Sequence, residues 1–284
     1  MDSGFIFGIL FGILAALMMN IGKGVQKQKV GVFLHGRRMF ARPQRRDLFI
    51  WLLGLAITAG AALPYSVGLM LSKSPSAIAA MTGVGLIGLT LYALKVIGEP
   101  MGRTDVLGMA LVVVGTSVLA LLGAEHPIGA RQLDDGQLLW AAAGMVLLCA
   151  AGCLAALRWR RIHGMVYGLA AGACIGLAIF LGDAGLVRAG GSLSGQLTTP
   201  YPYIALLFAA TATAVTQLGF LRGRALEVVP AVNAAAVITP LLLEAGLYAD
   251  PPPMAQLGII GLILIGVLLL STGAAARAVA AARR

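Results

Sequence analysis

Apolar residues fill nine stretches of the chain, and each stretch is long enough to cross a lipid bilayer. Leu, Ile, Val, Ala and Gly dominate these stretches, and few charged residues interrupt them. A helix of roughly 20 residues rises about 30 Å, which matches the hydrocarbon core of a bilayer. Lipid offers no partners to backbone polar groups, so spanning segments of this kind fold as helices. We predict an all-α polytopic membrane protein with transmembrane helices at 4–22, 48–71, 76–97, 105–123, 137–157, 164–187, 203–221, 228–247 and 257–275.

Basic residues gather at every second gap between the predicted spans. All but three of the 21 Lys and Arg residues lie in or beside the gaps that follow the first, third, fifth and seventh spans, or in the C-terminal tail. The exceptions are Lys73, Arg131 and Arg188. Cytoplasmic loops of membrane proteins carry the excess of basic residues. The pattern therefore predicts a protein of the plasma (inner) membrane with its N-terminus outside and its C-terminus in the cytoplasm.

The net charge of +10 would indicate a nucleic-acid partner if the chain were soluble. Here most of the cations, Lys23 and Lys27 among them, are assigned to short loops beside spans, where they set topology and contact lipid head groups. Membrane lipid is therefore the expected partner, and nucleic acid is not. In the segment 25–46 apolar residues alternate with cations, a pattern that favours a position in the membrane interface.

Motifs of enzymes are absent from the sequence. It contains no His-Glu-x-x-His, no Gly-x-Ser-x-Gly and no phosphate-binding loop of the Walker type. The three cysteines, Cys149, Cys153 and Cys174, all fall inside predicted helices, where we expect them to be small packing residues rather than metal ligands or disulfides. We expect no enzymatic activity and no cofactor.

The first four predicted spans resemble the last four in the order and spacing of glycine and proline. Glycine at every fourth residue opens both halves, and such spacing makes a ridge that another helix can approach closely. Ser74-Pro75 precedes a small-residue helix in the first half, and Val229-Pro230 does so in the second. The matching segments are 4–12 with 164–176, 64–86 with 219–241, and 107–115 with 257–266.

The fifth span lies between the two copies and makes the second copy enter the membrane from the opposite side. The predicted arrangement is therefore a 4+1+4 inverted repeat. Its three parts are a first four-helix repeat at 1–123, which includes the basic loop 23–47, a linker with the fifth span at 124–163, and a second repeat at 164–284. Inverted repeats are typical of secondary transporters, which bind their substrate near the midplane of the membrane.

Three stretches of sequence carry a resemblance to a known family. They are Asn20-Ile21-Gly22-Lys23-Gly24-Val25-Gln26-Lys27, then Lys73-Ser74-Pro75-Ser76-Ala77-Ile78 leading to Ile97-Gly98-Glu99-Pro100, and finally 214–226 with Val228-Val229-Pro230. With the nine-span layout, they make the chain similar to the drug/metabolite transporter (DMT) superfamily, and within it to the NIPA-type magnesium transporters. The resemblance implies a DMT-like bundle that moves a small solute, with Mg2+ or another divalent cation as the candidate. The alternatives are an EamA-like exporter of a small metabolite or organic cation and a membrane scaffold that moves nothing; a homodimer is a further candidate assembly.

Asp183 and Glu244 are the two carboxylates that lie well inside predicted spans. A charged side chain at the centre of a span costs about 2.5–3.5 kcal/mol, so each needs a partner, a cavity or a proton. Both fall in the outer third of the membrane. They are our candidate metal ligands, because two acids at similar depth attract a cation, and either acid could instead carry a coupling proton. The alternative is that both reach the outer interface.

Four uncharged polar residues lie deeper and are the other candidate ligands of a solute. They are Thr213, Gln217, Asn233 and Thr239. Pro240 removes one helical hydrogen bond and frees the carbonyl of Ala236. Hydroxyls, amides and a freed carbonyl together form a lining suited to a hydrated solute. The alternative is ordinary hydrogen bonding between helices. Glu227 begins the eighth span, and we expect it to interact with the N-terminus of its own helix.

Overall fold

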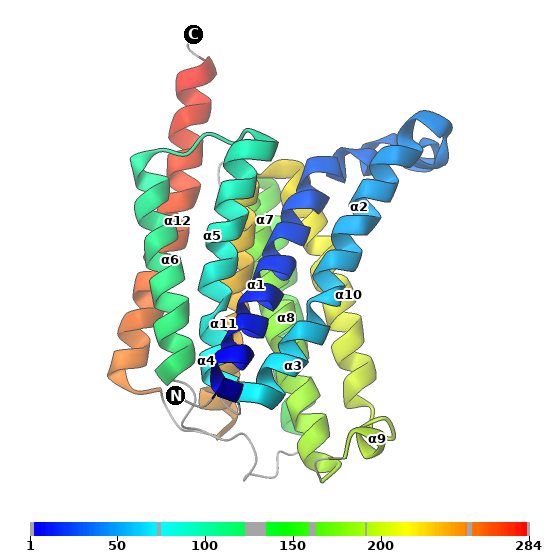
Figure 1. The fold of residues 1–284 in the computed structure, drawn as a ribbon, viewed down its shortest axis with the longest axis vertical. Helices are drawn as coiled ribbons and strands as arrows, with labels where there is room; N and C mark the ends of the chain where they lie inside the picture. The colour runs from blue at the N-terminus through cyan, green and yellow to red at the C-terminus, as the bar shows by residue number, and fades with distance from the viewer. Residues whose placement is uncertain are drawn as a thin grey trace.

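The computed structural model is a bundle of long helices that run roughly along one axis (Figure 1). It describes residues 3–72, 75–122, 135–158, 163–190, 192–248 and 252–282. Almost all of these residues are helical, and none of them lies in a β-strand. Within these ranges, nine helical segments are long and apolar enough to cross a membrane, which confirms the predicted number of spans. They are Ser3–Gly36, Arg42–Ser72, Ala77–Ile97, Arg103–Leu122, Gly136–Ala156, His163–Arg188, Tyr201–Arg222, Ala225–Leu247 and Met254–Gly273.

Two of the first four spans are interrupted. The second span breaks at Ala61, one turn before Pro64, because proline has no N–H group to continue the helix. The third span breaks at Met81 and ends as a short π-helix. The elements of this half are α1 (Ser3–Lys29), the 3₁₀ segment η1 (Val30–Phe40), α2 (Arg42–Gly60), α3 (Ala62–Ser72), α4 (Pro75–Ala80), α5 (Thr82–Tyr92), the π-helix η2 (Ala93–Ile97) and α6 (Arg103–Leu122).

The remaining spans are continuous, and a short helix precedes the seventh. The elements are α7 (Asp135–Arg158), α8 (His163–Arg188), α9 (Leu193–Gln196), α10 (Tyr201–Arg222), α11 (Ala225–Tyr248) and α12 (Met254–Ala282). Helix α7 packs mainly against α8 and lies at the edge of the bundle, with Trp140, Leu147 and Leu148 exposed. An exposed apolar face of this kind suits a helix that contacts lipid.

The first helix is longer than predicted. Helix α1 continues to Lys29, seven residues beyond the predicted end of the span. No proline lies between Asn20 and Lys29, and the Lys and Gln residues there are good helix formers, so the helix continues through Gly22 and Gly24. Lys23 and Lys27 are therefore helical residues and not the loop residues that we expected. The following segment η1 kinks at Gly36, where φ is 54°, and leads away from the bundle before α2 begins (Figure 1).

One end of the bundle carries most of the described basic residues that border the spans. Lys27, Lys29, Arg222 and Arg224 lie there, and we call it the basic end. It holds the end of α1, the α5–α6 connection and the C-terminal part of α12, all at the top of Figure 1. Other basic residues used to predict orientation lie outside the described residues, namely Lys73, Arg131, Arg160, Arg161, Arg283 and Arg284, as does Ser74 of the repeat motif.

Glycines bring several pairs of helices into backbone contact, and three of these pairs show how the bundle is arranged. Helices α8 and α11 run parallel, and a Cβ added at Gly168 would lie 2.6 Å from the Val228 carbonyl oxygen. Helices α1 and α5 also run parallel, with Gly85 against the backbone of Ala16. Helices α6 and α12 cross antiparallel, and a Cβ added at Gly108 would lie 2.6 Å from the carbonyl oxygen of Gly266. These approaches leave no room for a side chain.

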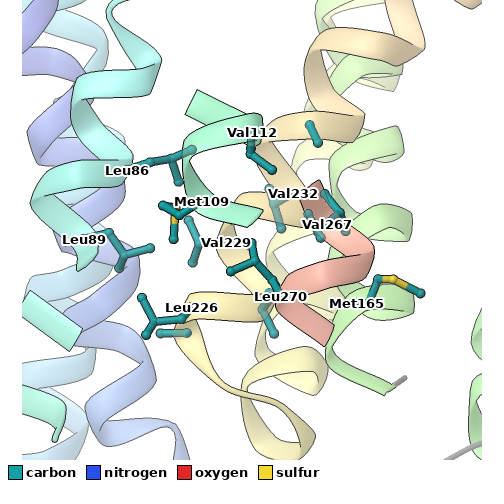
Figure 2. Packing of buried hydrophobic residues seen from close by; sticks show 14 of the residues in the cluster. Leu86, Leu89, Met109, Val112, Met165, Leu226, Val229, Val232, Val267 and Leu270 are labelled. Carbon is teal, nitrogen blue, oxygen red and sulfur yellow. The ribbon is translucent and has the colours of Figure 1, made fainter. Parts of the chain in front are cut away.

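The main apolar core lies where α5, α6, α8, α11 and α12 meet, and Figure 2 shows its side chains. It joins the third and fourth spans to the last two spans of the chain. The labelled members are Leu86, Leu89, Met109, Val112, Met165, Leu226, Val229, Val232, Val267 and Leu270. A second cluster around Phe180 packs α7, α8, α10 and α11 together. The buried face of α1 carries glycine and alanine in its first half and the polar residues Asn20, Lys23 and Gln26 toward its C-terminal end.

Candidate functional site

Three polar side chains on one face of α1 are buried near the basic end. Asn20, Lys23 and Gln26 are 0%, 7% and 2% exposed. Residues three apart on a helix lie on the same face, so the extension of α1 beyond residue 22 is what aligns them. This face contacts α10 and α11, which come from the other half of the sequence.

Asn233 of α11 connects two of these side chains. Its Nδ2 atom donates to Oδ1 of Asn20 at 2.8 Å. Its Oδ1 atom accepts from Nζ of Lys23 at 3.2 Å. Asn20 in turn donates through Nδ2 to the Ala16 carbonyl oxygen of its own helix at 2.9 Å. Asn233 is itself 8% exposed, so these hydrogen bonds are largely shielded from solvent.

Gln217 of α10 extends the same network toward α2. Its Nε2 atom donates to Oε1 of Gln26 at 2.7 Å, and its Oε1 atom accepts from Nε1 of Trp51 at 3.0 Å. Gln26 also donates to the Thr58 hydroxyl at 3.0 Å. Helix α2 can approach so closely because Gly22 has no side chain to meet Thr58. We call the five residues Asn20, Lys23, Gln26, Gln217 and Asn233 the polar seam.

The ammonium group of Lys23 sets the electrostatics of the polar seam. Among the described residues, no carboxylate forms an ion pair with it, and its hydrogen bond goes to a neutral amide. The side chain is nevertheless buried. A buried charge is costly unless it is paired, and ionisable residues inside a membrane protein mark functional sites. The polar seam is therefore a region of donor character and positive potential.

The structure places two of the sequence-predicted candidates, Gln217 and Asn233, in the polar seam. Sequence reasoning did not select Asn20, Lys23 and Gln26 as site residues. Lys23 and Gln26 were missed because the first span was ended at residue 22, which left Asn20 at the end of a span without polar neighbours on its face. A signal was present in the sequence, since the three residues follow one another at intervals of three with no proline between them.

The two candidate threonines lie outside the polar seam. Thr213 donates its hydroxyl to the Ala209 carbonyl oxygen of its own helix at 3.0 Å. Thr239 is 5% exposed and packs against Gly176 of α8. The Ala236 carbonyl, which Pro240 frees, also faces Gly176, because a Cβ added there would lie 3.1 Å from this oxygen. The space beside the proline is thus occupied by helix α8.

The candidate metal ligands Asp183 and Glu244 lie toward the opposite end from the polar seam. Both side chains are half-buried. Glu244 follows Asn233 on α11 by eleven residues, about 16 Å along the helix axis. The carboxyl group of Asp183 lies within electrostatic range of the Tyr65 hydroxyl on α3. No cluster of three or more His, Cys, Asp and Glu side chains occurs in the part of the chain that the structure describes.

Helix ends at the basic end are held by charged side chains from other helices. Lys27 of α1 donates to the carbonyl oxygens of Phe220 and Gly223 at 2.5 and 2.7 Å, at the C-terminus of α10. Cations stabilise helix C-termini, where carbonyl groups lack partners. Arg224, which follows in the chain, donates to the Pro100 carbonyl oxygen. It also lies 3.6 Å from the carboxylate of Asp105 on α6.

Glu99 holds the N-terminus of α11. Its two carboxylate oxygens accept from the backbone N–H groups of Ala225 and Leu226 at 2.7 and 3.1 Å. Gly98, with φ at 78°, ends the preceding π-helix in a left-handed conformation that favours glycine, and this turn is what presents Glu99. Helix α11 consequently begins at Ala225, earlier than the sequence predicted, and Pro230 lies inside it.

Glu227 interacts with the N-termini of two helices. It lies at the start of its own helix, as expected, where the backbone N–H of Arg224 is a hydrogen-bond partner of its carboxylate. Its Oε1 atom also accepts from the backbone N–H of Met165 at 2.9 Å, in the first turn of α8. The Ser271 hydroxyl of α12 donates to the same atom at 3.1 Å. The sequence predicted the contact with its own helix and did not predict the contact with α8. Gly164 permits the contact, because a side chain there would collide with the carboxylate.

Comparison with known proteins finds no family model, no curated protein and no solved structure that matches the chain. The resemblance to the DMT superfamily thus stays a prediction from sequence motifs. Among the described residues, the arrangement that bears on function is a buried polar seam joining the first helix to the tenth and eleventh, within a bundle of membrane-spanning length.

Proposed function

We propose that the chain is a membrane transporter that moves a small solute between its two halves. The observation that supports this most is the polar seam: five buried polar side chains where α1 meets α10 and α11. Polar and charged groups inside a membrane protein are costly, and those of transporters line the path of the substrate. A scaffold needs close helix packing, which the glycines supply, but it has no need of a buried ammonium group.

We also propose the 4+1+4 inverted repeat for this bundle, with 1–123 and 164–284 as its copies. Three packing relationships support it. The first helix of each copy runs parallel to a later helix of the same copy, α1 to α5 and α8 to α11. The last helices of the copies, α6 and α12, cross antiparallel, as equivalent helices do when related by an axis in the membrane plane. The helix α7 lies at the edge.

Membership of the DMT superfamily and the nine-span branch belongs to the same proposal. So does the orientation, in which the basic end faces the cytoplasm of a cell with this protein in its plasma (inner) membrane. A homodimer is the assembly state that remains to be measured.

The placement of charges favours an organic metabolite over a divalent cation. Asp183 and Glu244, the acids suited to Mg2+, lie about 16 Å from the polar seam along the helix axes. The amide oxygens of the polar seam already accept hydrogen bonds, and its ammonium group repels a cation. Such groups suit an organic metabolite, as in the EamA-like alternative. Transport of Mg2+ stays the prediction that the sequence resemblance makes.

Purified protein in liposomes tests the proposal. Flux of Mg2+, other divalent ions, amino acids, carboxylates and organic cations is measured for the wild type and for Gln217→Leu and Asn233→Leu. We expect flux of at least one solute, and a loss of at least tenfold in each variant. Thr211→Val is the matched control in α10, because this exposed hydroxyl donates to the Leu207 carbonyl of its own helix. A scaffold gives no flux of any solute.

A further inference from the structure

The Lys23 ammonium group has more hydrogen-bonding capacity than its surroundings use. It carries three N–H donors, and the structure shows a hydrogen bond from it to Oδ1 of Asn233. Only 7% of the residue is exposed, so bulk water does not compensate for the rest. Buried cations in proteins are paired with an anion or with several acceptors.

The carboxylates near the basic end are engaged elsewhere. Glu99 accepts two backbone N–H groups of α11, and Glu227 accepts the Met165 N–H and the Ser271 hydroxyl. Both lie within electrostatic range of Lys27. Asp105 is paired with Arg224 and accepts from the Gly102 N–H. Among the described residues, the chain therefore gives Lys23 a neutral amide as its hydrogen-bond partner and directs its nearby acids to helix N-termini.

We propose that Lys23 binds an anionic oxygen group, a carboxylate or a phosphate, on the transported solute. This inference rests on the proposed function and names its substrate class. The counter-ion that the chain does not provide is supplied by the solute when it enters the polar seam. Lys23 donates its unused N–H groups to the anion, and the amide of Asn233, already bound to Nζ, orients the ammonium group.

The neighbouring amides fit this role because they can donate to an anion as well. Asn233 and Gln217 each have two amide N–H groups, and each is shown giving one of them to a side chain of α1. The solute thus meets donors from α1, α10 and α11 at once. A cation at the same position would face Lys23 directly, and the polar seam rejects it by charge repulsion.

The first experiment measures thermal unfolding of the purified full-length protein with single probes. Inorganic phosphate and glycerol 3-phosphate represent phosphates, acetate and succinate represent carboxylates, and tetraethylammonium and Mg2+ represent cations. A ligand that binds only the folded state raises the Tm, by about 5–10 °C at 100 times its Kd for a chain of this size. We expect such a rise with at least one anion. Comparing the phosphates with the carboxylates shows which of the two groups is recognised.

Substitutions assign the effect to Lys23. Lys23→Gln keeps polarity and removes the charge, and we expect it to weaken anion binding at least tenfold. Lys23→Arg keeps the charge and should retain binding within a few-fold. Lys95→Gln is the matched control, since it removes an exposed cation from η2 at the same end of the bundle. Equal binding by wild type and Lys23→Gln overturns the inference.

A second variant covers the case in which Lys23→Gln does not fold. Asn233→Asp places a carboxylate beside Lys23, which then has its counter-ion within the chain. We expect this protein to fold, to keep or raise its Tm without ligand, and to lose the response to every anion. A response to anions equal to that of the wild type contradicts the inference, because an internal carboxylate should compete with the solute.

The outcomes separate this inference from the proposed function. If the protein transports a cation and Lys23→Gln does not change that flux, the protein is a transporter but the proposed anion site at Lys23 is wrong. Anion binding that depends on Lys23, without flux of any probe into liposomes, supports the site and contradicts transport. No binding of any of the four anions by wild type overturns the inference outright.

Discussion

The side-chain amide of Asn233 donates to Oδ1 of Asn20 at 2.8 Å, across 213 positions of the sequence. The same asparagine accepts the hydrogen bond from Lys23. One residue of α11 therefore satisfies two buried groups of α1, and the two helices are joined through it. Asn20 is neutral and Lys23 is charged, so losing the hydrogen bond to Lys23 should cost more stability than losing the one to Asn20.

Alanine at either end of this hydrogen bond should have unequal effects. Asn20→Ala removes one hydrogen bond between helices, worth about 0.6 kcal/mol on average in a membrane. Asn233→Ala also leaves the buried Lys23 ammonium group without its hydrogen-bond acceptor, which should lower the free energy of unfolding by about 1–3 kcal/mol more. Unfolding of the purified protein in denaturant measures both changes. Adding Lys23→Met to Asn233→Ala should recover part of the loss, whereas equal costs for the two single variants would contradict the shared role of Asn233.

The glycine ridge of α8 gives a second prediction. Gly168→Ala puts a methyl group 2.6 Å from the Val228 carbonyl oxygen, and the resulting overpacking should cost about 1–3 kcal/mol. Gly182 lies on the same helix with nothing within 4 Å of its added Cβ. Gly182→Ala should therefore be neutral or stabilising by up to about 1 kcal/mol. Similar unfolding free energies for the two variants would show that the helices do not pack this closely.

Hydrogen exchange tests the role of Glu99. Two backbone N–H groups at the start of α11 donate to the Glu99 carboxylate, and Glu99→Gln removes its charge. Hydrogen bonds to charged groups are worth about 1.5–3 kcal/mol. We expect the amides of Ala225 and Leu226 to exchange at least tenfold faster, while the middle of α11 is unaffected. Lys95→Gln, nearby on η2, serves as the control. Unchanged exchange in Glu99→Gln would mean that α11 begins without help from Glu99.

Reporter fusions test the orientation. A reporter after Arg284 should be found in the cytoplasm, and a tag before Met1 should be accessible from outside. The physical reason is the excess of basic residues at one end of the spans, which includes Lys29, Arg222 and Arg224. Both termini on the same side of the membrane would contradict nine spans and the inverted repeat together.

A substitution of Glu244 tests whether this carboxylate couples solute flux to a cation or a proton. If Glu244 binds a cation or carries a coupling proton, Glu244→Gln keeps its size and removes its charge, and flux should fall at least tenfold, or about 1.4 kcal/mol. Asp183→Asn should reduce flux less, because Asp183 has greater freedom to reach the membrane surface. Flux into liposomes, measured against pH, distinguishes the two. Wild-type flux with an unchanged pH profile in Glu244→Gln would leave the polar seam as the site of recognition.

The spans were predictable because hydropathy is a local property. Each of the nine is visible in roughly 20 consecutive residues, and most of the boundaries agree within a few residues. The largest differences are at the end of the first span, where α1 continues to Lys29, and at the start of the second, where α2 begins at Arg42. Two further details have long-range causes. Helix α11 begins before its predicted start where Glu99, from a distant helix, accepts its first N–H groups. Glu227 also accepts from the backbone N–H of Met165, 62 positions earlier in the chain.

The candidate site was predictable only in part for the same reason. Gln217 and Asn233 stood out because they interrupt apolar helices. Lys23 did not, because a cation at the end of a span is ordinarily a topology signal and its burial depends on Asn233, 210 positions away. No periodicity within α1 reveals which helix faces it. The inverted repeat, the family and the transported solute stay predictions.

The contact between α8 and α11 also has a mechanical meaning. Backbone packed against backbone through Gly168 resists sliding by less than a helical turn, because any smaller shift drives atoms into one another. The two helices should therefore move as a single rod. The hydrogen bonds of Asn233 to α1 can instead be exchanged one at a time for water or for a solute. We therefore expect relative motion to occur at the face where α1 meets these two helices.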